Sequence, residues 1–377
     1  MRILHIIPSL EVGGAEVMLA RLCPALSAQG FENKVISMKG EGPILPRLQN
    51  CAVPVECLNL NSGGGLVPAW RRLRTMIHRY DPEVIHAWMY HAGLAARSVA
   101  WGNRRPSLVL GVHAVPLDLE LEKPRTRAVI RILARLSSGF DAICYVSKAS
   151  AEVHASMGYA GRITQIIPNG FDVGGFKPDP EARKRIRTEL KISSNAIVIG
   201  LVARWHPMKD HTNFLRAASI FLKTHPDANF VLVGPGIDAN NGTLMKSAEE
   251  LGVLASLRLC GCRTDMAAIN ASLDIATSSS AYGESLPLSM GEAMACAVPC
   301  VATAVGGVSE IVGDTGIVVP PGDPLALCSG WLTLAGMRRG ELGSLGARAR
   351  QRIDERFSLA ACTSAHATLY RGLRGQL

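Results

Sequence analysis

Short apolar segments alternate with longer segments of helical periodicity along almost the whole chain. In the first half, the candidate strands cover residues 3–7, 34–38, 84–87, 107–112, 142–146 and 163–167. In the second half, they cover residues 196–203, 229–233, 256–260, 274–278, 299–302 and 316–319. Such alternation is typical of parallel sheets that carry helices on both faces. The sequence therefore predicts an α/β fold.

The alternation pauses once, after the segment PNGFD (Pro168 to Asp172). Residues 173–195 are rich in glycine, proline and charge, which is typical of a linker. We expect two Rossmann-like, doubly wound domains over residues 1–172 and 196–357, with a helix at about 358–377 that packs back on the first domain. Ligands of open α/β sheets bind at the carboxyl ends of strands, so two such sheets facing each other would form a binding cleft.

Composition excludes several classes of protein. No apolar run approaches the roughly 20 residues that span a bilayer, and the apolar start lacks a signal-peptide cleavage site. None of the 10 cysteines has zinc-site spacing. Scattered cysteines in a long chain without an export signal are usually reduced, so we expect a cytoplasmic protein with free thiols. The net charge of +9 indicates an anionic partner, namely a phosphate-bearing substrate, an acidic membrane or a nucleic acid. Aromatic residues make up only 5% and are not interleaved with basic ones, which argues against nucleic acid.

The segment VGGAE (Val12 to Glu16) lies between the first candidate strand and the first candidate helix. Gly13 and Gly14 would let a ligand approach the backbone, and a helix N-terminus attracts anions. The segment is not the dinucleotide motif GxGxxG. Taken alone, it fits a tight strand–helix turn as well as a ligand-binding loop.

The segment GLVARWHPMKDH (Gly200 to His211) brings two cations to the end of a candidate strand. Arg204 follows the strand, and Lys209 stands five residues later, near the start of a helix. A planar guanidinium and a point-like ammonium suit a diphosphate and stabilise the charge that grows on a leaving phosphate. The alternative is a pair of solvated surface cations, which the following helix disfavours.

The segment SSSAYGESLPLSMGEAMACAVPCVAT (Ser278 to Thr303) carries two carboxylates at the end of another strand. We expect Glu284 in the turn and Glu292 about two turns into a helix that begins near residue 286 or 287. Carboxylates accept hydrogen bonds from sugar and ribose hydroxyls. The backbone N–H groups of Ser285 and Leu286 are expected to meet a phosphate at the helix start.

The chain resembles glycosyltransferase family 4, which contains retaining enzymes of the GT-B fold. Six segments match in order, and they cover both predicted domains. They are VGGAE, PNGFD, GLVARWHPMKD, LVGPG (Leu232 to Gly236), the ES-LPLSMG-E spacing and PCVATAVGGVSEIV. The two-glutamate motif with its neighbouring strand is specific, whereas VGGAE and LVGPG are individually common.

The resemblance implies a role for each matching residue. Arg204 and Lys209 would hold the donor diphosphate, Glu284 the hydroxyls of the transferred sugar and Glu292 the ribose. The glycines of VGGAE would approach the donor phosphate or the acceptor. The full predicted donor-binding set is Gly13, Gly14, Arg204, Lys209, Gly234, Ser285, Leu286 and Glu292.

Three further positions follow from the resemblance. His113 falls where many relatives place a histidine near the sugar, although a structural histidine is an equal alternative. The predicted catalytic residues are therefore Glu284, Arg204, Lys209 and His113. Ser285 stands where many relatives have glycine and would re-tune the donor pocket. Gly291 stands where leucine is common, which we expect to be neutral.

The resemblance also implies the reaction. We expect retaining transfer of a hexose-type sugar from a UDP- or GDP-sugar to a glycan or lipid-linked acceptor, in polysaccharide or cell-envelope biosynthesis. The chain contains no Asp-x-Asp sequence, so we expect neither a metal nor another cofactor. Retention rests on the resemblance alone.

A basic amphipathic segment, Lys123 to Ser138, places Arg127, Arg131 and Arg135 at four-residue spacing. A second basic stripe lies within residues 71–79. Such helices can lie on an anionic membrane, here the inner face of the cytoplasmic membrane. An ordinary packed helix with a solvated arginine face also fits, and the pattern alone slightly favours it.

Two other functions stay open at this point. A nucleotide-sugar epimerase can share the two-domain fold without using an acceptor. A non-enzymatic sugar-binding protein would normally carry an export signal and would not need paired cations beside paired glutamates.

Overall fold

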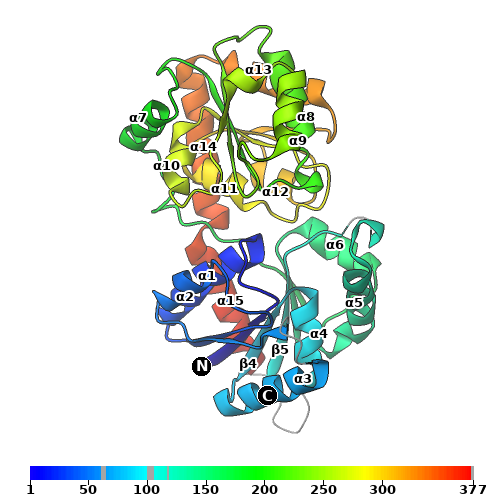
Figure 1. The fold of residues 1–377 in the computed structure, drawn as a ribbon. Helices are drawn as coiled ribbons and strands as arrows, with labels where there is room; N and C mark the ends of the chain where they lie inside the picture. Colours follow the sequence, from blue (N-terminus) through cyan, green and yellow to red (C-terminus); the bar gives the residue numbers. More distant parts are fainter. Residues whose placement is uncertain (61–64, 100–105, 117–118, 375–377) are drawn as a thin grey trace. The chain divides into compact units, whose positions relative to one another are not determined.

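The computed structural model describes residues 1–60, 65–99, 106–116 and 119–374. The chain forms two compact units (Figure 1). Unit 1 comprises Met1–Gly170 and Leu359–Leu377, and unit 2 comprises Phe171–Ser358. The C-terminal helix therefore belongs to the same unit as the N-terminus.

Unit 1 is built on a seven-stranded parallel sheet in the order β3-β2-β1-β4-β5-β6-β7. The strands are β1 (Arg2–Ile7), β2 (Glu32–Ser37), β3 (Val55–Cys57), β4 (Val84–Trp88), β5 (Ser107–Val112), β6 (Ala142–Tyr145) and β7 (Ile163–Ile166). The helices are α1 (Gly14–Ser27), α2 (Leu45–Gln49), α3 (Leu66–Tyr80), α4 (Met89–Val99), α5 (Pro124–Leu136), α6 (Lys148–Ser156) and α15 (Leu359–Arg374).

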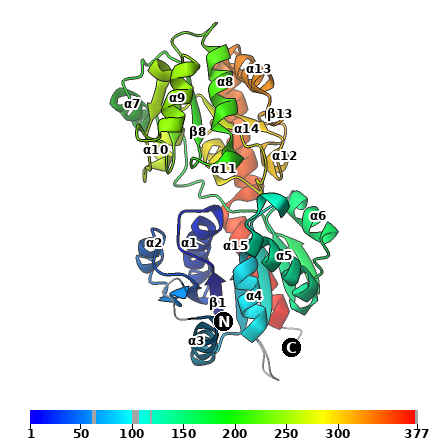
Figure 2. The same ribbon diagram turned by 45° about the vertical axis from the view of Figure 1, so that its right-hand side comes forward.

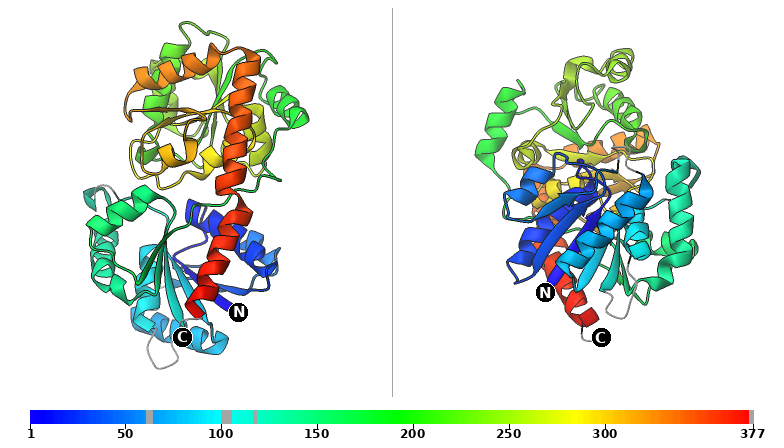
Figure 3. Two further views of the ribbon diagram at one scale, coloured as in Figure 1. Left: turned by 180° about the vertical axis from the view of Figure 1, so that it is seen from behind. Right: turned by 60° about the horizontal axis from the view of Figure 1, so that its bottom comes forward.

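Helices cover both faces of this sheet. Successive strand residues point to opposite faces, so Ile3 and Ile7 belong to one core and Leu4 and Ile6 to the other. The first core is closed by α1 and α15, and the second by α3, α4 and α5. Figures 2 and 3 show the two helical layers from different sides.

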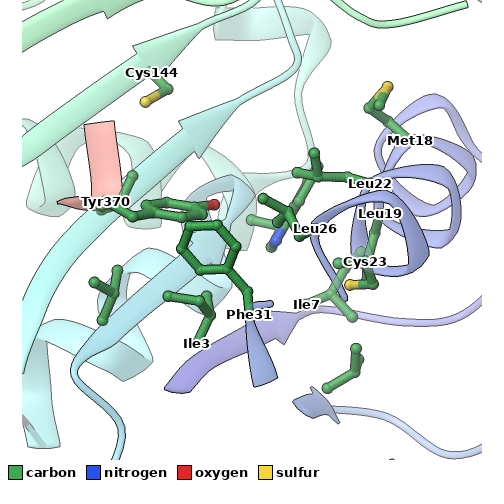
Figure 4. Close-up of a cluster of buried hydrophobic side chains, with 14 of the residues drawn as sticks. Ile3, Ile7, Met18, Leu19, Leu22, Cys23, Leu26, Phe31, Cys144 and Tyr370 are labelled. Atoms are coloured by element: carbon green, nitrogen blue, oxygen red, sulfur yellow. The ribbon is translucent and has the colours of Figure 1, made fainter. Parts of the chain in front are cut away.

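The C-terminal helix completes the first core. Tyr370 of α15 is fully buried, and its ring lies 6.1 Å from the ring of Phe31. Leu19, Leu22 and Leu26 of α1 surround the same space (Figure 4). Because α15 fills this core, it is an integral part of unit 1.

Unit 2 is built on a six-stranded parallel sheet in the order β10-β9-β8-β11-β12-β13. The strands are β8 (Val198–Val202), β9 (Asn229–Val233), β10 (Leu257–Leu259), β11 (Ile275–Ser278), β12 (Cys300–Thr303) and β13 (Ile317–Val319). The helices are α7 (Pro180–Glu189), α8 (His211–Phe221), α9 (Gly242–Glu250), α10 (Met266–Ser272), α11 (Leu288–Ala295), α12 (Val308–Val312), α13 (Pro324–Ala335) and α14 (Arg339–Phe357).

The predicted linker, residues 173–195, lies within unit 2. Its helix α7 packs against α10, and the guanidinium of Arg187 on α7 donates to Asp274 at 2.7 Å. Asp274 also accepts a hydrogen bond from the Val198 N–H, at the start of β8. This buried link ties the segment to the sheet.

The predicted fold class is confirmed, since both sheets are parallel and both carry helices on their two faces. All twelve predicted strands are present, with ends that differ by no more than two residues. The sequence analysis missed β3, which has only three residues. All ten cysteines are free thiols.

Candidate functional site

The predicted site residues of unit 2 follow three neighbouring strands. Arg204 and Lys209 follow β8, Gly234 follows β9, and Glu284 follows β11. The sheet order places β9, β8 and β11 side by side, and all three run parallel. Their carboxyl ends therefore meet at one edge of the sheet, the edge where ligands of open α/β sheets bind.

Lys209 and Glu284 form the centre of this group. The Lys209 Nζ donates to Glu284 Oε1, and the two side chains are only 18% and 8% exposed. The Ser280 hydroxyl donates to the same oxygen at 2.6 Å. Among the residues that the structure describes, both side-chain contacts of Glu284 use Oε1, so Oε2 is left for a ligand.

Backbone hydrogen bonds fix the short 3₁₀ turn that carries Lys209, Pro207–Lys209, against the end of β11. The Ser279 hydroxyl donates to the Lys209 carbonyl oxygen at 2.8 Å, and the Ala281 N–H donates to the Met208 carbonyl oxygen at 2.8 Å. These bonds join residues about 70 positions apart in the sequence. They fix the cation relative to the carboxylate.

A glycine pair after β12 supports the backbone of Glu284. Gly306 has a φ of +56°, and a Cβ at this position would overlap the Glu284 carbonyl oxygen. The Gly307 N–H donates to the Ser285 carbonyl oxygen at 2.9 Å. Only glycine allows both the close approach and the left-handed backbone here.

Ser285 contributes a buried hydroxyl that the protein does not use. Its side chain is 6% exposed, and its Oγ has no hydrogen-bond partner among the described residues. A buried polar group without a partner is rare in folded proteins. This hydroxyl is therefore a candidate ligand contact beside Glu284.

Arg204 lies in the loop after β8, with an exposed side chain. In the part of the chain that the structure describes, no ion pair or side-chain hydrogen bond engages it. The loops that follow β8 and β9 are joined by a hydrogen bond from the Trp205 N–H to the Pro235 carbonyl oxygen. Gly234, with a φ of +150°, allows this approach because a Cβ would meet the Ala203 carbonyl.

The predicted start of the helix that carries the second glutamate needs correction. Helix α11 begins at Leu288, with Pro287 at its N-cap, so Glu292 lies only about one turn into the helix. Ser285 and Leu286 precede the helix and are not part of its first turn. Glu292 is 8% exposed, so it is not a solvated surface residue. Its contact with ribose stays a prediction.

In unit 1, Gly13 is the N-cap of α1 and Gly14 is its first residue. A Cβ on Gly13 would overlap the Glu16 carboxylate, so that acidic side chain lies directly over Gly13. A carboxylate at a helix N-terminus already occupies the place an anion would take. The local electrostatics favour a hydroxyl-bearing ligand over a phosphate here.

His113 follows β5 and is part of a buried aromatic stack. Its ring lies 4.9 Å from that of Trp88, with an angle of 21° between the planes, and Trp88 stacks on His86 at 4.7 Å. Burial and the nearby His366 lower the pKa of His113 to about 3, although a hydrogen bond with Asn169 opposes them. His113 is therefore neutral near pH 7 and cannot serve as a cationic acid there.

The structure thus brings some of the predicted site residues together. Lys209 and Glu284 are in contact, and Arg204 and Gly234 lie on adjacent loops. Gly13, Gly14 and His113 belong to unit 1, and the expectation that they share a cleft with the others stays a prediction. In the described ranges, no group of three His, Cys, Asp or Glu side chains could hold a metal ion.

The sequence did not lead us to two residues that support Glu284. Ser280 bonds the catalytic candidate Glu284, and Gly306 makes room for that residue's backbone. The run of small polar residues after β11 and the glycine pair in AVGGV were visible signals for both.

Two family models together match most of the chain. "Glycosyltransferase Family 4" matches residues 12–174, and "Glycosyl transferases group 1" matches residues 196–336. The two matches lie on the sheets of unit 1 and unit 2.

Curated relatives include several named glycosyltransferases. The chain is 34% identical to a D-inositol 3-phosphate glycosyltransferase of Corynebacterium jeikeium, over 42% of this chain and 40% of that protein. It is 30% identical to a GDP-mannose-dependent alpha-(1-6)-phosphatidylinositol monomannoside mannosyltransferase of Mycolicibacterium smegmatis, over 66% of each. The chain thus spans less than two thirds of the length of these relatives.

Solved structures show the same fold over nearly the whole chain. Anabaena Alr3699/HepE in complex with UDP superposes with a TM-score of 0.85 at 23% identity, covering 99% of this chain and 100% of that one. The sucrose-phosphate synthase of Thermosynechococcus elongatus gives 0.85 at 18% identity, covering 100% of both chains. At this identity the likeness shows the fold alone, which is that of GT-B glycosyltransferases. With both family models matched, the chain belongs to glycosyltransferase family 4.

Proposed function

We propose that this protein transfers a hexose-type sugar from a nucleotide-diphosphate donor to an acceptor hydroxyl. The observation that carries the proposal is the Lys209–Glu284 pair, joined with Ser280 at the carboxyl end of β11. A cation for phosphate and a carboxylate for sugar hydroxyls stand at the edge of the sheet where ligands bind.

The roles follow from the chemistry of each group. An ammonium has three donors, so Lys209 can keep its bond to Glu284 while it binds a donor phosphate. Arg204, five residues earlier in the same loop, adds a planar fork for the same diphosphate. As the sugar–phosphate bond breaks, both cations stabilise the charge that develops on the leaving group. The Glu284 Oε2 accepts hydrogen bonds from the sugar, and Glu292 is assigned to the ribose.

The donor is a UDP- or GDP-sugar in this proposal. Anabaena Alr3699/HepE is solved with UDP and with UDP-glucose, and the Mycolicibacterium relative is named as GDP-mannose-dependent. These names support the two nucleotide classes equally.

The acceptor is a glycan or a lipid-linked molecule, consistent with a role in polysaccharide or cell-envelope assembly. Glu16 lies over Gly13 at the start of α1, an arrangement that suits acceptor hydroxyls. The mannosyltransferase relative is named for phosphatidylinositol monomannoside, which supports the lipid-linked alternative. Such an acceptor would place this protein at the inner face of the cytoplasmic membrane. Among the described residues, no helix is both long and apolar enough to cross a bilayer.

We further propose retention at the anomeric carbon without a metal. Family membership supports retention, and the two cations provide the charge neutralisation that a metal would otherwise supply. His113 contributes only as a neutral hydrogen-bonding group, because burial lowers its pKa to about 3.

Product analysis tests the proposal. Purified protein is first screened with UDP- and GDP-sugars for an increase in melting temperature. A donor that stabilises the protein is then incubated with it in the presence of a chelator, once with and once without acceptor glycans. We expect a glycoside with the donor's anomeric configuration plus free nucleotide diphosphate. Conversion of donor to another nucleotide sugar without acceptor would instead show an epimerase. Binding of donor without turnover in any mixture would favour the sugar-binding alternative.

A further inference from the structure

Asp210, the residue directly after Lys209, has a left-handed backbone. Its φ is +44° and its ψ is +57°. Residues other than glycine rarely adopt this conformation, because their Cβ comes too close to the following carbonyl oxygen, although aspartate tolerates it better than most. Such a backbone persists only where the surrounding structure fixes it, and it is found preferentially at functional sites.

Asp210 joins two elements without a spacer. It ends the 3₁₀ turn Pro207–Lys209, and its N–H donates to the Pro207 carbonyl oxygen at 3.1 Å. The same residue is the N-cap of α8, where its Oδ1 accepts a hydrogen bond from the Asn213 N–H at 3.1 Å. The backbone conformation of Asp210 therefore sets the direction of the turn relative to the helix.

The N-cap bond by itself does not require a left-handed backbone. Asp179 and Asp323 cap α7 and α13 of unit 2 with the same kind of side-chain bond, each at 2.9 Å. Both have an extended backbone, with φ of −143° and −112°, as is usual for an N-cap. The conformation of Asp210 therefore serves the turn that precedes it, and that turn carries Lys209.

The turn is held from two sides. On one side, Asp210 connects it to α8, whose Phe214, Leu215 and Phe221 are fully buried in the core of unit 2. On the other side, the hydrogen bonds from the residues after β11 hold the carbonyl oxygens of Met208 and Lys209. The position of the Lys209 backbone thus depends on both supports.

The loop that carries Glu284 depends on the same turn. Gly283 directly precedes Glu284 and has a φ of +77°. A Cβ at Gly283 would overlap the Met208 Sδ, so the Met208 side chain lies against this glycine. A shift of the turn would therefore disturb the cation and the carboxylate together.

We propose that Asp210 is a positioning residue of the donor site. Its left-handed backbone, locked by the bond to Asn213, directs Lys209 towards Glu284 and the donor diphosphate. This role rests on the proposed function, since it takes Lys209 as a ligand of the diphosphate. Asp210 acts through Lys209 and needs no contact with the donor. A displacement of about 1 Å in a binding group can cost up to about 100-fold, so a residue that only orients the turn can matter for binding.

Three substitutions separate the backbone from the cap. Asp210→Asn keeps a side-chain acceptor and tolerates the left-handed backbone, so it should bind UDP or GDP within about three-fold of the parent protein. Asp210→Ala loses both features and should weaken binding about ten-fold. Asp210→Gly allows the backbone but lacks the cap, so its affinity should lie between the two. Calorimetric titration with UDP and with GDP measures these affinities.

Asp323→Ala is the matched control, because it removes an aspartate cap from another helix of unit 2. Loss of a cap should lower the melting temperature of unit 2 by about 2–4 °C in both alanine variants, and the control should still bind the nucleotide as the parent does. Parent-like affinity in Asp210→Ala, an equal loss of affinity in Asp323→Ala, or an equal loss in Asp210→Asn would each overturn the proposal.

Kinetics separate this proposal from the proposed function. In Asp210→Ala, kcat/KM for the donor should fall by at least about ten-fold, while the KM for the acceptor should stay within about two-fold of the parent value. A parent protein that binds UDP or GDP but transfers no sugar would overturn the proposed function, and the comparison of affinities would still decide the role of Asp210. A parent protein that binds neither nucleotide would contradict both proposals.

Discussion

At the scale of single residues, the candidate donor site contains a polar atom that the protein leaves without a partner. The Ser285 hydroxyl is buried next to Glu284, and no described residue bonds to it. A buried unsatisfied hydroxyl costs about 1–3 kcal/mol of stability. We interpret this cost as the consequence of a hydrogen bond that forms only when the donor binds.

Ser285→Ala should therefore have opposite effects on stability and on binding. The free protein should be as stable as the parent or more stable, because no unsatisfied hydroxyl remains. Donor affinity should fall about 3–10-fold, the range of a typical neutral hydrogen bond. Thermal unfolding with and without a UDP- or GDP-sugar measures both quantities. Ser344→Ala, on an exposed position of α14, is the control. A less stable variant with unchanged donor affinity would refute the assignment.

At the scale of secondary-structure elements, the motif PNGFD positions the helix that follows Glu284. Phe171 of this motif is buried, and a Cβ at Gly291 of α11 would overlap its ring. The Phe171 N–H also donates to the Phe357 carbonyl oxygen at 2.8 Å. The ring thus fills the space that a side chain at position 291 would occupy, so Gly291 and Phe171 are a matched pair.

Gly291→Leu should consequently destabilise the protein, contrary to the neutral effect expected from the sequence. Overpacking of a close-packed core lowers the free energy of unfolding by about 1–3 kcal/mol. Replacing a helical glycine raises it by roughly 1 kcal/mol at most, so the overpacking should dominate. Urea unfolding provides the measurement. In a Phe171→Ala background, the same substitution should cost nothing or add stability. A Gly291→Leu variant as stable as the parent would show that the ring can move aside.

Elements were more predictable from the sequence than the contacts between them. Apolar runs such as Ser107–Val112 and Asn229–Val233 matched the structure exactly in extent because buried parallel strands have near-continuous apolar sequences. The sequence predicted that Lys209 and Glu284 each follow a strand. It did not predict that their side chains are in contact. The bond from Ser280 to Glu284 is local and was missed. The glycine pair in AVGGV was a visible signal, but the partners of Gly306 and Phe171 could not be predicted, because they lie far away in the sequence.

At the scale of the whole molecule, the two units differ in their buried titratable groups. Burial lowers the pKa of His5 and of His366 to about 4, and the pKa of His86 is lowered in the same way. The Trp88 indole N–H donates to His5 Nδ1 at 3.2 Å, which requires a neutral ring. His154 is a further buried histidine of unit 1, with a pKa lowered to about 4. In the described part of unit 2, His211 alone is comparably buried.

Acid should therefore destabilise unit 1 more steeply than unit 2. Each of these histidines is neutral in the folded state and becomes protonated in the unfolded state below about pH 6.5. Unfolding then takes up protons, so stability falls as the pH drops from 6.5 towards 4, by about 1.4 kcal/mol per pH unit for each histidine. Calorimetry at pH 7 and pH 5 should show the unit 1 transition moving further. His366→Gln, which changes unit 1 alone, identifies that transition and should reduce its movement. Equal movement of both transitions would contradict this account.

The central claim is that Lys209, paired with Glu284, binds the diphosphate of a nucleotide sugar. The most direct measurement is calorimetric titration of UDP- and GDP-sugars into the parent protein and into the Lys209→Met variant. Lys246→Met is the control, because Lys246 forms an exposed ion pair with Glu250 on α9. We predict that Lys209→Met weakens donor binding by about 10–150-fold, the range for a hydrogen bond to a charged group, and that Lys246→Met binds as the parent does. Equal donor affinity in Lys209→Met and the parent would contradict the claim.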